Sequence, residues 1–375
     1  MTSKERLLLA LQRKETDRLP YAPLADNYFA ASLPKQGFKY DLVEALKYIG
    51  CDIMLRHGPA YLPVYKHSVS VDTIEKEGKF ETHYKTPVGE IYNRFYFENG
   101  TMFMQKHLLE TIEDVKIMTY VAENTDFTPT FDAFYESEKN LGDFGIWTPD
   151  VPCSPLMDTL QVLCGLENTS FFMVDEPEIM EAMFNALHER NKKVCRILCD
   201  LNFPAAFSYE DTSTTIMSKY WLTEYAIPAL NDYANILHAA GKTYITHMCG
   251  KLSGFKTEIA DVLADGIDSV CPPTTGDLAL PDAQKAFPSK ILIGGIEPPS
   301  LVLQPRDTIL RNVFQIINQI PDKSGIILST GDAVPFGAPV ETLKAIADLI
   351  RHFGRRSLEG NISQDEIEKY LSSLQ

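Results

Sequence analysis

The sequence has no long apolar run, and none of its hydrophobic stretches approaches the ~20 residues that a membrane-spanning helix needs. Its beginning, from Met1 to Arg6, also lacks the basic-then-apolar order of a secretory signal. Together these two absences predict a soluble, cytoplasmic protein that works without a membrane.

Positive charge is scarce as well. The 375 residues include 35 Lys and Arg against 51 Asp and Glu. Nucleic-acid backbones and polyphosphates are bound by clustered cations, so this balance argues against both as partners. A disulfide framework is also missing, because the seven cysteines are odd in number and widely scattered. That pattern is typical of reduced thiols in a cytosolic protein.

What the sequence does contain is a regular alternation of short apolar strands with helices. Nearly every strand is followed by a helix, and this order favours a (β/α)8 TIM barrel, with a doubly wound sheet as the alternative. We expect a single domain over residues 1–375. The eight expected strands begin near residues 21, 51, 144, 205, 243, 267, 291 and 325.

Residues 68–97 break this alternation. They alternate apolar and polar side chains around a glycine and a Pro-Val-Gly turn, with no room for a helix. This pattern predicts an antiparallel excursion of two to four strands in the N-terminal third. Near the other end of the chain, Ser363 and Glu366 have the spacing of a capping box, which predicts a C-terminal helix within residues 361–375.

The strand near residue 243 ends on a histidine and a cysteine two residues apart. Side chains at that spacing lie on the same face of a strand, so His247 and Cys249 should point the same way. An imidazole and a thiolate that converge on one point are suited to Zn²⁺. The alternative is a buried histidine beside an unreactive cysteine.

The barrel prediction also bears on other polar residues. Active sites of such barrels lie at the carboxyl ends of the strands. Acids and metal-binding groups gather at those positions in this sequence. The residues expected there are Arg56, His57, Trp147, Glu210, Asp211, His247, Cys249, Cys271, Glu297 and Asp332.

Five stretches together resemble the uroporphyrinogen decarboxylase superfamily, particularly its corrinoid-dependent methyltransferase branch. The His-Met-Cys-Gly of residues 247–250 is similar to the His-x-Cys-Gly of those methyltransferases. Their order and spacing match over nearly the whole chain, and the resemblance implies the same (β/α)8 fold that the strand count favours. The other stretches are residues 4–11 with 17–20, 174–178, 294–298 and 328–332.

The resemblance implies a zinc site. In the methyltransferases, zinc is held by the His and Cys of His-x-Cys and by a later cysteine after the last strand. His247 and Cys249 match, but the later position is Asp332. A carboxylate also binds zinc, at about 2.0–2.2 Å, so the predicted ligands are His247, Cys249 and Asp332. Cys271 or Glu210 as the third ligand, and loss of the metal, are the alternatives.

The segment after the first strand argues against decarboxylation of uroporphyrinogen. The decarboxylases carry paired arginines there, whereas residues 22–28 contain no arginine. A substrate with many carboxylates would be left unpaired in a closed site, which is costly. The predicted function is therefore transfer of a methyl group between a small-molecule donor or acceptor and the cobalt of a corrinoid, carried on a separate corrinoid-binding protein.

Zinc has two possible uses under this hypothesis. It either holds a thiol as thiolate or polarises a methyl-ether or alcohol oxygen. The carboxylate at position 332 favours the second use, as in demethylation of methoxylated compounds. Glu210 or Asp211 would handle the proton on the leaving oxygen, although Asp211 equally fits a helix N-cap. The residues expected to bind substrate are Tyr28, His57, Trp147 and Cys271, with Tyr61 as a further aromatic.

Two other functions stay open at this point. One is decarboxylation of the uroporphyrinogen type. The other is a barrel that binds a ligand without catalysis, since Asp332 departs from the family pattern.

Overall fold

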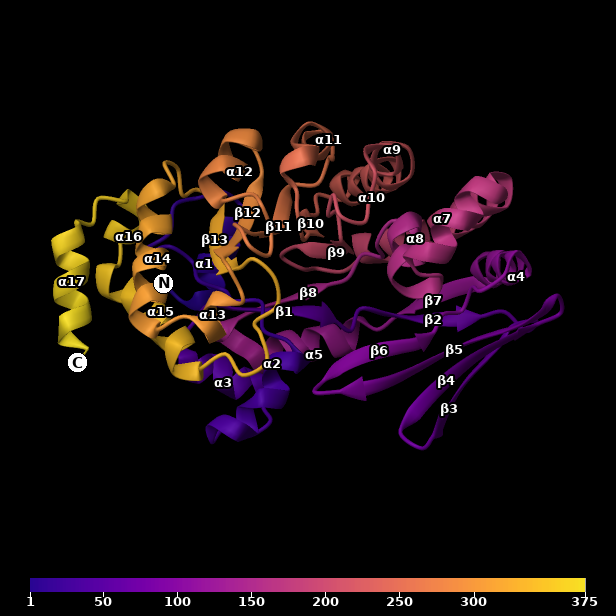
Figure 1. Cartoon of the computed structure of the whole chain (residues 1–375), viewed down its shortest axis with the longest axis horizontal. Coiled ribbons are helices and arrows are strands. Elements are labelled where there is room, and N and C mark those ends of the chain that lie inside the picture. The colour runs from indigo at the N-terminus through magenta and orange to yellow at the C-terminus, as the bar shows by residue number, and fades with distance from the viewer. Residues whose placement is uncertain (375) are drawn as a thin grey trace.

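The computed structural model describes residues 1–374. It is an α/β protein in which helices cover parallel strands, and separate antiparallel strands project from one side (Figure 1). The predicted α/β alternation and the antiparallel excursion are both confirmed.

The parallel strands form one five-stranded sheet, in the order β13-β12-β11-β10-β9, and one two-stranded sheet, β1-β8. Each is short and buried along almost its whole length, as expected for strands covered on both faces. Their bounds are β1 (Ile53–Gly58), β8 (Gly145–Pro149), β9 (Ala206–Glu210), β10 (Tyr244–Met248), β11 (Gly266–Val270), β12 (Ile291–Ile296) and β13 (Ile326–Thr330).

Single contacts link the two parallel sheets to each other and to the segment around Tyr21. Asp150, just after β8, forms a parallel bridge with Phe207 of β9. Tyr21 forms a parallel bridge with Leu328 of β13, and its carbonyl accepts a hydrogen bond from Asp52 N–H, just before β1 (2.7 Å). The expected strand near residue 21 is thus reduced to one bridge. The prolines at positions 20 and 23 lack the N–H groups that a longer ladder needs.

A small cluster of apolar side chains lies between the parallel strands. It includes Ile146, Phe207, Ile245 and Ile293, all fully buried, and α1 (Ser3–Leu11) packs on it through Leu7. Helix α1 begins as the sequence predicts, because the Thr2 side chain accepts from Glu5 N–H and the Glu5 side chain accepts from Thr2 N–H. These side chains fill the space between the strands below their carboxyl ends.

A second and much larger core lies between the strands and the surrounding helices. Helices α14 to α17 stand at one end of the molecule in Figure 1, and the antiparallel sheet projects at the other. The remaining helices are α2 (Asn27–Ser32), α3 (Leu42–Ile49), α4 (Ile112–Glu123), α5 (Phe131–Leu141), α6 (Pro155–Asp158), α7 (Leu166–Asp175), α8 (Pro177–Cys199), α9 (Lys219–Trp221), α10 (Ile227–Ala239), α11 (Lys256–Ala260), α12 (Leu280–Ala286), α13 (Ser300–Leu303), α14 (Arg306–Gln319), α15 (Val340–Phe353), α16 (Arg356–Glu359) and α17 (Gln364–Ser373).

Short 3₁₀ and π turns complete the helical parts. The 3₁₀ turns are η1 (Leu33–Gln36), η2 (Gly142–Phe144) and η5 (Ser253–Phe255), and the π turns are η3 (Thr159–Leu163) and η4 (Leu222–Ala226). Helix α17 carries the predicted capping box of Ser363 and Glu366. Gln375, the last residue of the expected C-terminal helix, lies outside the described residues.

The antiparallel part is larger than the sequence suggests. Strands β3 (Ser70–Lys76), β4 (Lys79–Thr86), β5 (Gly89–Glu98) and β6 (Thr101–Lys106) form a four-stranded meander, so the excursion extends past the expected end at residue 97. Strands β2 (Tyr61–Tyr65) and β7 (Thr125–Pro129) pair beside it. The register of β2 with β7 joins segments more than 50 residues apart, which no local pattern indicates. Within residues 1–374, no helix is both long and apolar enough to cross a membrane.

Candidate functional site

Polar side chains replace the apolar ones where the parallel strands end. Arg56 of β1, His247 of β10 and Asp268 of β11 are all buried and in mutual contact. Tyr209 of β9 lies beside them, with its ring 5.5 Å from the ring of His247. The guanidinium of Arg56 sits 4.7 Å above the ring of Phe207, so this polar layer rests directly on the inner apolar cluster.

Asp268 and Arg56 form a two-pronged ion pair. Arg56 donates from Nη2 to Oδ1 of Asp268 (2.9 Å) and from Nη1 to Oδ2. Burial by itself raises the pKa of Asp268, but the charges of Arg56 and His247 and the hydrogen bonds with both hold that pKa well below its ordinary value. Asp268 is therefore a carboxylate at any ordinary pH.

The strand β11 that carries Asp268 is irregular on the side of β12. The register of β11 with β12 shifts between Ile267 and Val270, and Ser269 has a φ of 74°. That conformation is uncommon for a residue other than glycine and marks local strain. The contact with His247 itself needs no irregularity, because His247 and Asp268 are direct partners in the pairing of β10 with β11.

The contact with Asp268 sets the chemistry of His247. Nδ1 of His247 donates to Oδ2 of Asp268 at 2.6 Å. The proton of the neutral ring therefore sits on Nδ1, which leaves the lone pair of Nε2 free for a ligand. Metal-binding histidines commonly have this arrangement, with one nitrogen on the metal and the other on a carboxylate.

Cys249 lies just past the end of β10 and is half-buried among acids. Burial raises the pKa of the Cys249 thiol, and the negative charges of Asp332 and Asp211 raise it further, as does a hydrogen bond with Asp211. The thiol therefore keeps its proton unless a cation compensates these charges. Gly250 makes the turn possible, because it has a φ of 85° and a Cβ there would lie 2.5 Å from the side chain of Ser213.

Asp211 and Asp332 face Cys249 from the loops after β9 and β13. Burial raises the pKa of Asp211, and the charge of Asp332 adds to that rise. Oδ1 of Asp332 accepts from the N–H of Ala333 (2.7 Å). Asp211 receives a long hydrogen bond from Ser213 N–H (3.5 Å), but the alternative of a helix N-cap at Asp211 is wrong, because the next helix, α9, begins at Lys219 and is capped by Ser218. The structure thus brings Cys249, Asp211 and Asp332 together.

Zinc is a chemically reasonable occupant of this place. His247 Nε2, the Cys249 sulfur and the Asp332 carboxylate are the nitrogen, sulfur and oxygen donors that zinc sites use. Among residues 1–374, however, no three His, Cys, Asp or Glu side chains are arranged to hold a metal ion. Of the predicted donors, Cys249 and Asp332 interact through their charges, and a metal on the three residues stays a proposal.

Glu210 points away from this group. Its Oε1 accepts from Ser154 N–H (2.5 Å) and its Oε2 from the Ser154 hydroxyl (2.8 Å), and the side chain is fully buried. Ser154 in turn caps α6. The structure thus places Glu210 at the start of α6 and brings Asp211, of the two adjacent acids, to Cys249.

Glu210→Gln is expected to flatten the pH dependence of stability. Burial raises the pKa of Glu210 to about 8. The folded protein then keeps a proton that the unfolded chain releases above about pH 4.3, so the free energy of unfolding falls as pH rises from about 5 to 8. The fall is at most about 1.4 kcal/mol per pH unit. Glutamine has no proton to lose. Urea unfolding of both proteins across this range measures the effect, and parallel curves would contradict a protonated Glu210.

The other predicted site residues are spread over different places. Cys271 is buried near Asp332, and burial with the charges of Glu297 and Asp332 raises its pKa to about 12. Tyr28 is half-buried with its ring 5.5 Å from that of Phe336. Trp147 packs against the outer core, because its neighbour Ile146 faces inward. The expected role of Trp147 in a substrate pocket has no support in that placement.

His57, predicted to bind substrate, and Arg56, predicted at the same strand end, differ in availability. Arg56 is occupied by Asp268, whereas the side chain of His57 is 68% exposed. Nδ1 of His57 pairs with Oδ2 of Asp150 (2.6 Å), and its ring stacks on Tyr209 at 4.9 Å. His57, Tyr209 and His247 thus follow one another across the strand ends.

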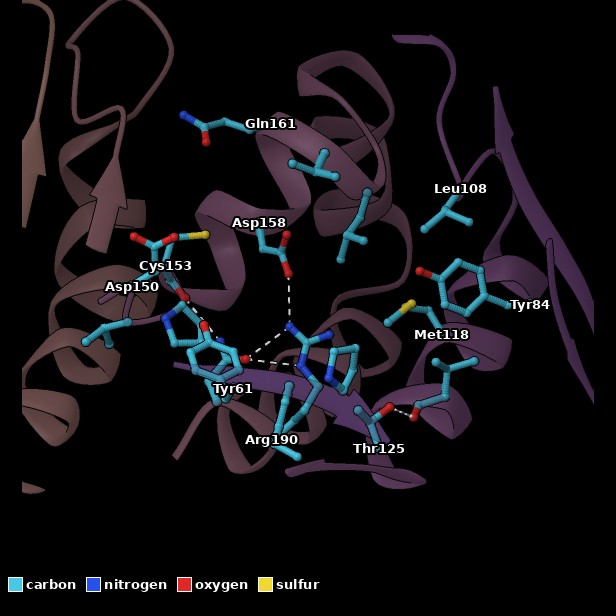
Figure 2. A pocket seen from close by; sticks show the side chains of 18 of the residues that line it. Tyr61, Tyr84, Leu108, Met118, Thr125, Asp150, Cys153, Asp158, Gln161 and Arg190 are labelled. Carbon is cyan, nitrogen blue, oxygen red and sulfur yellow. Dashed lines mark hydrogen bonds and ion pairs between the residues drawn. The ribbon is translucent and has the colours of Figure 1, made fainter. Parts of the chain in front are cut away.

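Asp150 and Tyr209 also line a pocket beside the strand ends (Figure 2). Its volume is about 490 Å³, within the range of small-molecule sites. Tyr61, predicted as a pocket aromatic, lies in its wall. The pocket adjoins the His247 layer through Tyr209.

Sequence reasoning missed Asp268, Asp150 and Tyr209 as members of the site. Asp268 had a signal, because an acid inside a buried apolar strand needs a partner. Tyr209 and Asp150 had none, since their roles depend on pairing with segments far away in the chain.

Comparisons with known proteins agree with this architecture. The model of the uroporphyrinogen decarboxylase (URO-D) family matches residues 155–353, which is more than half of the chain. No curated protein matches the sequence.

Two solved structures align with most of the chain, and the first of them has a similar fold. A methyltransferase from Methanosarcina mazei aligns with a TM-score of 0.60 and 13% sequence identity, over 94% of this chain and 99% of its own. A B12-independent methionine synthase from Shewanella sp. W3-18-1 aligns with a TM-score of 0.46 and 9% identity, over 89% of this chain and 98% of its own. At such identities the likeness concerns the fold alone.

Proposed function

The chain belongs to the uroporphyrinogen decarboxylase family, as its sequence predicts, and from this membership we propose that it is an enzyme that transfers methyl groups. The substrate partners would be a small molecule that carries the methyl group, such as a methoxylated compound, and a corrinoid on a separate corrinoid-binding protein. The observation that carries the proposal concerns the end of β10. There, His247 is oriented by Asp268 and is followed two residues later by Cys249.

We also propose that the parallel strands close into a barrel. Each parallel segment contacts the next, from Tyr21 through β1, β8 and β9 to β13, and Leu328 of β13 returns to Tyr21. These contacts support a (β/α)8 TIM barrel. In such a barrel, Arg56, Tyr209, His247 and Asp268 would form one layer at the mouth, where catalytic groups belong.

The negative charge at the strand ends argues against a substrate that carries many carboxylates, such as a tetrapyrrole. Asp332 interacts through its charge with both Asp26 and Asp211. Arg56, at the end of β1, is already paired with Asp268. Bringing more carboxylates into this acidic place would cost free energy without cations to compensate them. Decarboxylation of uroporphyrinogen is therefore the weaker proposal.

His247, Cys249 and Asp332 would hold zinc. When bound, zinc supplies a Lewis acid that polarises an oxygen, and a positive charge that keeps a thiol ionised. The neighbouring Asp211 and Asp332 provide the negative charge that a cation at Cys249 needs. Asp268 would keep the ring of His247 fixed, as carboxylates do behind metal-binding histidines.

The proposed methyl transfer is a displacement in which the bonds formed and broken balance. The reduced cobalt of the corrinoid supplies the electron pair of the new bond to the methyl carbon, and the carbon–oxygen bond of the donor breaks. The leaving oxygen keeps the electron pair of that bond and takes a proton. Asp211, with its raised pKa, lies beside Cys249 and would deliver this proton.

A methylation assay tests the proposal. The protein is incubated with reduced cobalamin and a panel of methoxylated compounds and thiols, and the cobalt absorption spectrum reports the methylated product. We expect turnover with a member of the panel and a loss of turnover in Asp211→Asn. Absence of turnover with every member of the panel would reject methyl transfer, whether or not the protein decarboxylates uroporphyrinogen.

A further inference from the structure

Strand β3 is a free edge of the antiparallel meander. It pairs with β4 on one side only, and in Figure 1 it lies at the outer side of the projecting sheet, away from β2 and β7. Residues 72–76 are all exposed, and Ile74 is 55% exposed. The strand has no proline, and its ladder with β4 has no bulge. A regular, exposed edge that carries an apolar side chain is a ready template for another strand.

The hairpin of β3 and β4 fixes which backbone groups face outward. Its turn has two residues, Glu77 and Gly78, with φ of 54° and 73°, so Lys76 and Lys79 form the hydrogen-bonded pair that closes it. From there the two kinds of pair alternate, and every second residue of β3 points its N–H and C=O away from β4. Within residues 1–374, no other segment forms backbone hydrogen bonds with these groups. The residues that point outward are Val71, Thr73 and Glu75.

Two charges of opposite sign flank Ile74 on β3. Asp72, Ile74 and Lys76 occupy alternate positions, so their side chains share one face of the sheet. Among residues 1–374, neither charge has an ion-pair partner, and Asp72 receives only a hydrogen bond from the hydroxyl of Ser70 (3.3 Å). An acid two positions before an apolar residue and a base two positions after it are complementary to an antiparallel copy of the same strand.

One register of such a pairing satisfies these groups. Outward-facing residues pair with outward-facing residues, so a two-fold symmetric, antiparallel pairing is centred on a residue. A centre at Asp72, Glu75 or Lys76 places like charges opposite each other, which is unfavourable. A centre at Thr73 places Asp72 opposite Ile74, and centres nearer the start of β3 leave most of the strand unpaired. A centre at Ile74 places Ile74 opposite its copy and Asp72 opposite Lys76 of the second chain.

We propose that two copies of this chain associate through their β3 strands, antiparallel and centred on Ile74, so that the two meanders become one continuous sheet. Thr73 of each copy pairs with Glu75 of the other, which makes about four backbone hydrogen bonds. Ile74 packs on its copy, with an ion pair of Asp72 and Lys76 on either side. One strand edge per copy is a small contact, so the dimer is weak and reversible. It does not depend on the proposed methyl transfer.

Sedimentation equilibrium of the full-length protein tests the association. Over about 1–200 µM, a range in which small interfaces dissociate, we expect the average mass to rise from that of one chain, 42.2 kDa, toward twice that value. A protein that stays monomeric at every concentration would overturn the proposal.

Charge exchange tests the register. Asp72→Lys is expected to raise the dissociation constant at least about tenfold, because it places lysines opposite each other at both ends of the contact. Lys76→Asp should have the same effect through opposed aspartates. The double variant Asp72→Lys/Lys76→Asp restores opposite charges and should return the dissociation constant to within about threefold of the wild type. Single variants that dimerise as the wild type does, or a double variant that does not recover, would overturn this register.

Glu98→Lys is the matched control for these variants. Glu98 is exposed at the end of β5, on the same face of the sheet as Asp72, and the substitution changes the charge by the same amount. Because β5 is separated from β3 by β4, Glu98→Lys should dimerise like the wild type.

Ile74→Cys locates the two-fold axis without disturbing the charges. Cα atoms of an antiparallel pair without mutual hydrogen bonds lie about 4.5 Å apart, within reach of a disulfide. Mild oxidation should therefore join two copies of this variant covalently. Glu98→Cys, also exposed on the sheet, should stay largely monomeric, and the wild type gives the background from its own cysteines. Equal crosslinking of the two variants would contradict an axis at Ile74.

Discussion

His247→Ala is expected to leave a folded protein that holds no zinc and transfers methyl groups at least about a thousandfold more slowly. Loss of a Lewis acid costs several kcal/mol of transition-state stabilisation, and each 1.4 kcal/mol is about tenfold in rate. The fold should persist because Asp268 keeps its ion pair with Arg56 after the imidazole is gone. Elemental analysis of the purified protein, thermal unfolding and the methylation assay measure the three quantities.

His238→Ala is the matched control for this experiment. His238 also pairs with an aspartate, Asp265 at 3.0 Å, but it lies on α10, at the end of the sheet away from Cys249. That variant should keep its zinc and its rate. A wild-type protein that takes up no zinc from zinc-supplemented medium, or a His247→Ala protein that retains all of it, would remove the metal from the proposal.

Asp268→Asn is expected to lower the free energy of unfolding by about 3–5 kcal/mol and to weaken zinc binding about 10–100-fold. The first effect follows because the buried guanidinium of Arg56 loses its charge partner. The second follows because a carboxylate behind a metal-binding histidine orients the ring and raises its basicity. Urea unfolding and competition with a zinc chelator report the two effects separately.

Asp52→Asn separates stability from metal binding. Asp52 is fully buried and bonded to Arg6 (2.5 Å) and Arg18 (3.0 Å), so it resembles Asp268 in its environment. It precedes β1, at the opposite end of the strands from His247. We expect a similar loss of stability and no loss of zinc affinity. If both variants weakened zinc equally, Asp268 would have no specific role behind His247.

Much of the architecture follows from local signals. Strands such as β10 and β13 are short runs rich in β-branched residues. They are buried on both faces, which is why their sequences are recognisable as strands of a covered parallel sheet. Helix starts such as Thr2 and Ser363 were predictable because a capping box is complete within four residues. The extent of the antiparallel part was not, because β6 and the pair of β2 with β7 depend on register between distant segments.

Part of the site was visible for the same reason. His247 and Cys249 are two residues apart at the end of β10, so the expectation that they point the same way depends on local sequence alone. Asp332 was expected through a resemblance, and the structure does bring its charge to Cys249. Glu210 and Trp147 were expected at the same place, but alternation along β9 and β8 turns them toward the helices, at Ser154 and the outer core.

By itself, the sequence determined the alternation of the parallel strands with helices, the family, and the histidine and cysteine at the end of β10. Those features depend on residues that are neighbours along the chain. Only the tertiary structure decided that Asp268 holds His247, that Arg56 is taken by Asp268 instead of facing a ligand, and that Asp150 and Tyr209 open onto an aromatic pocket. These contacts join strands separated by up to about two hundred residues, as Arg56 and Asp268 are, and their geometry exists only once the strands are paired.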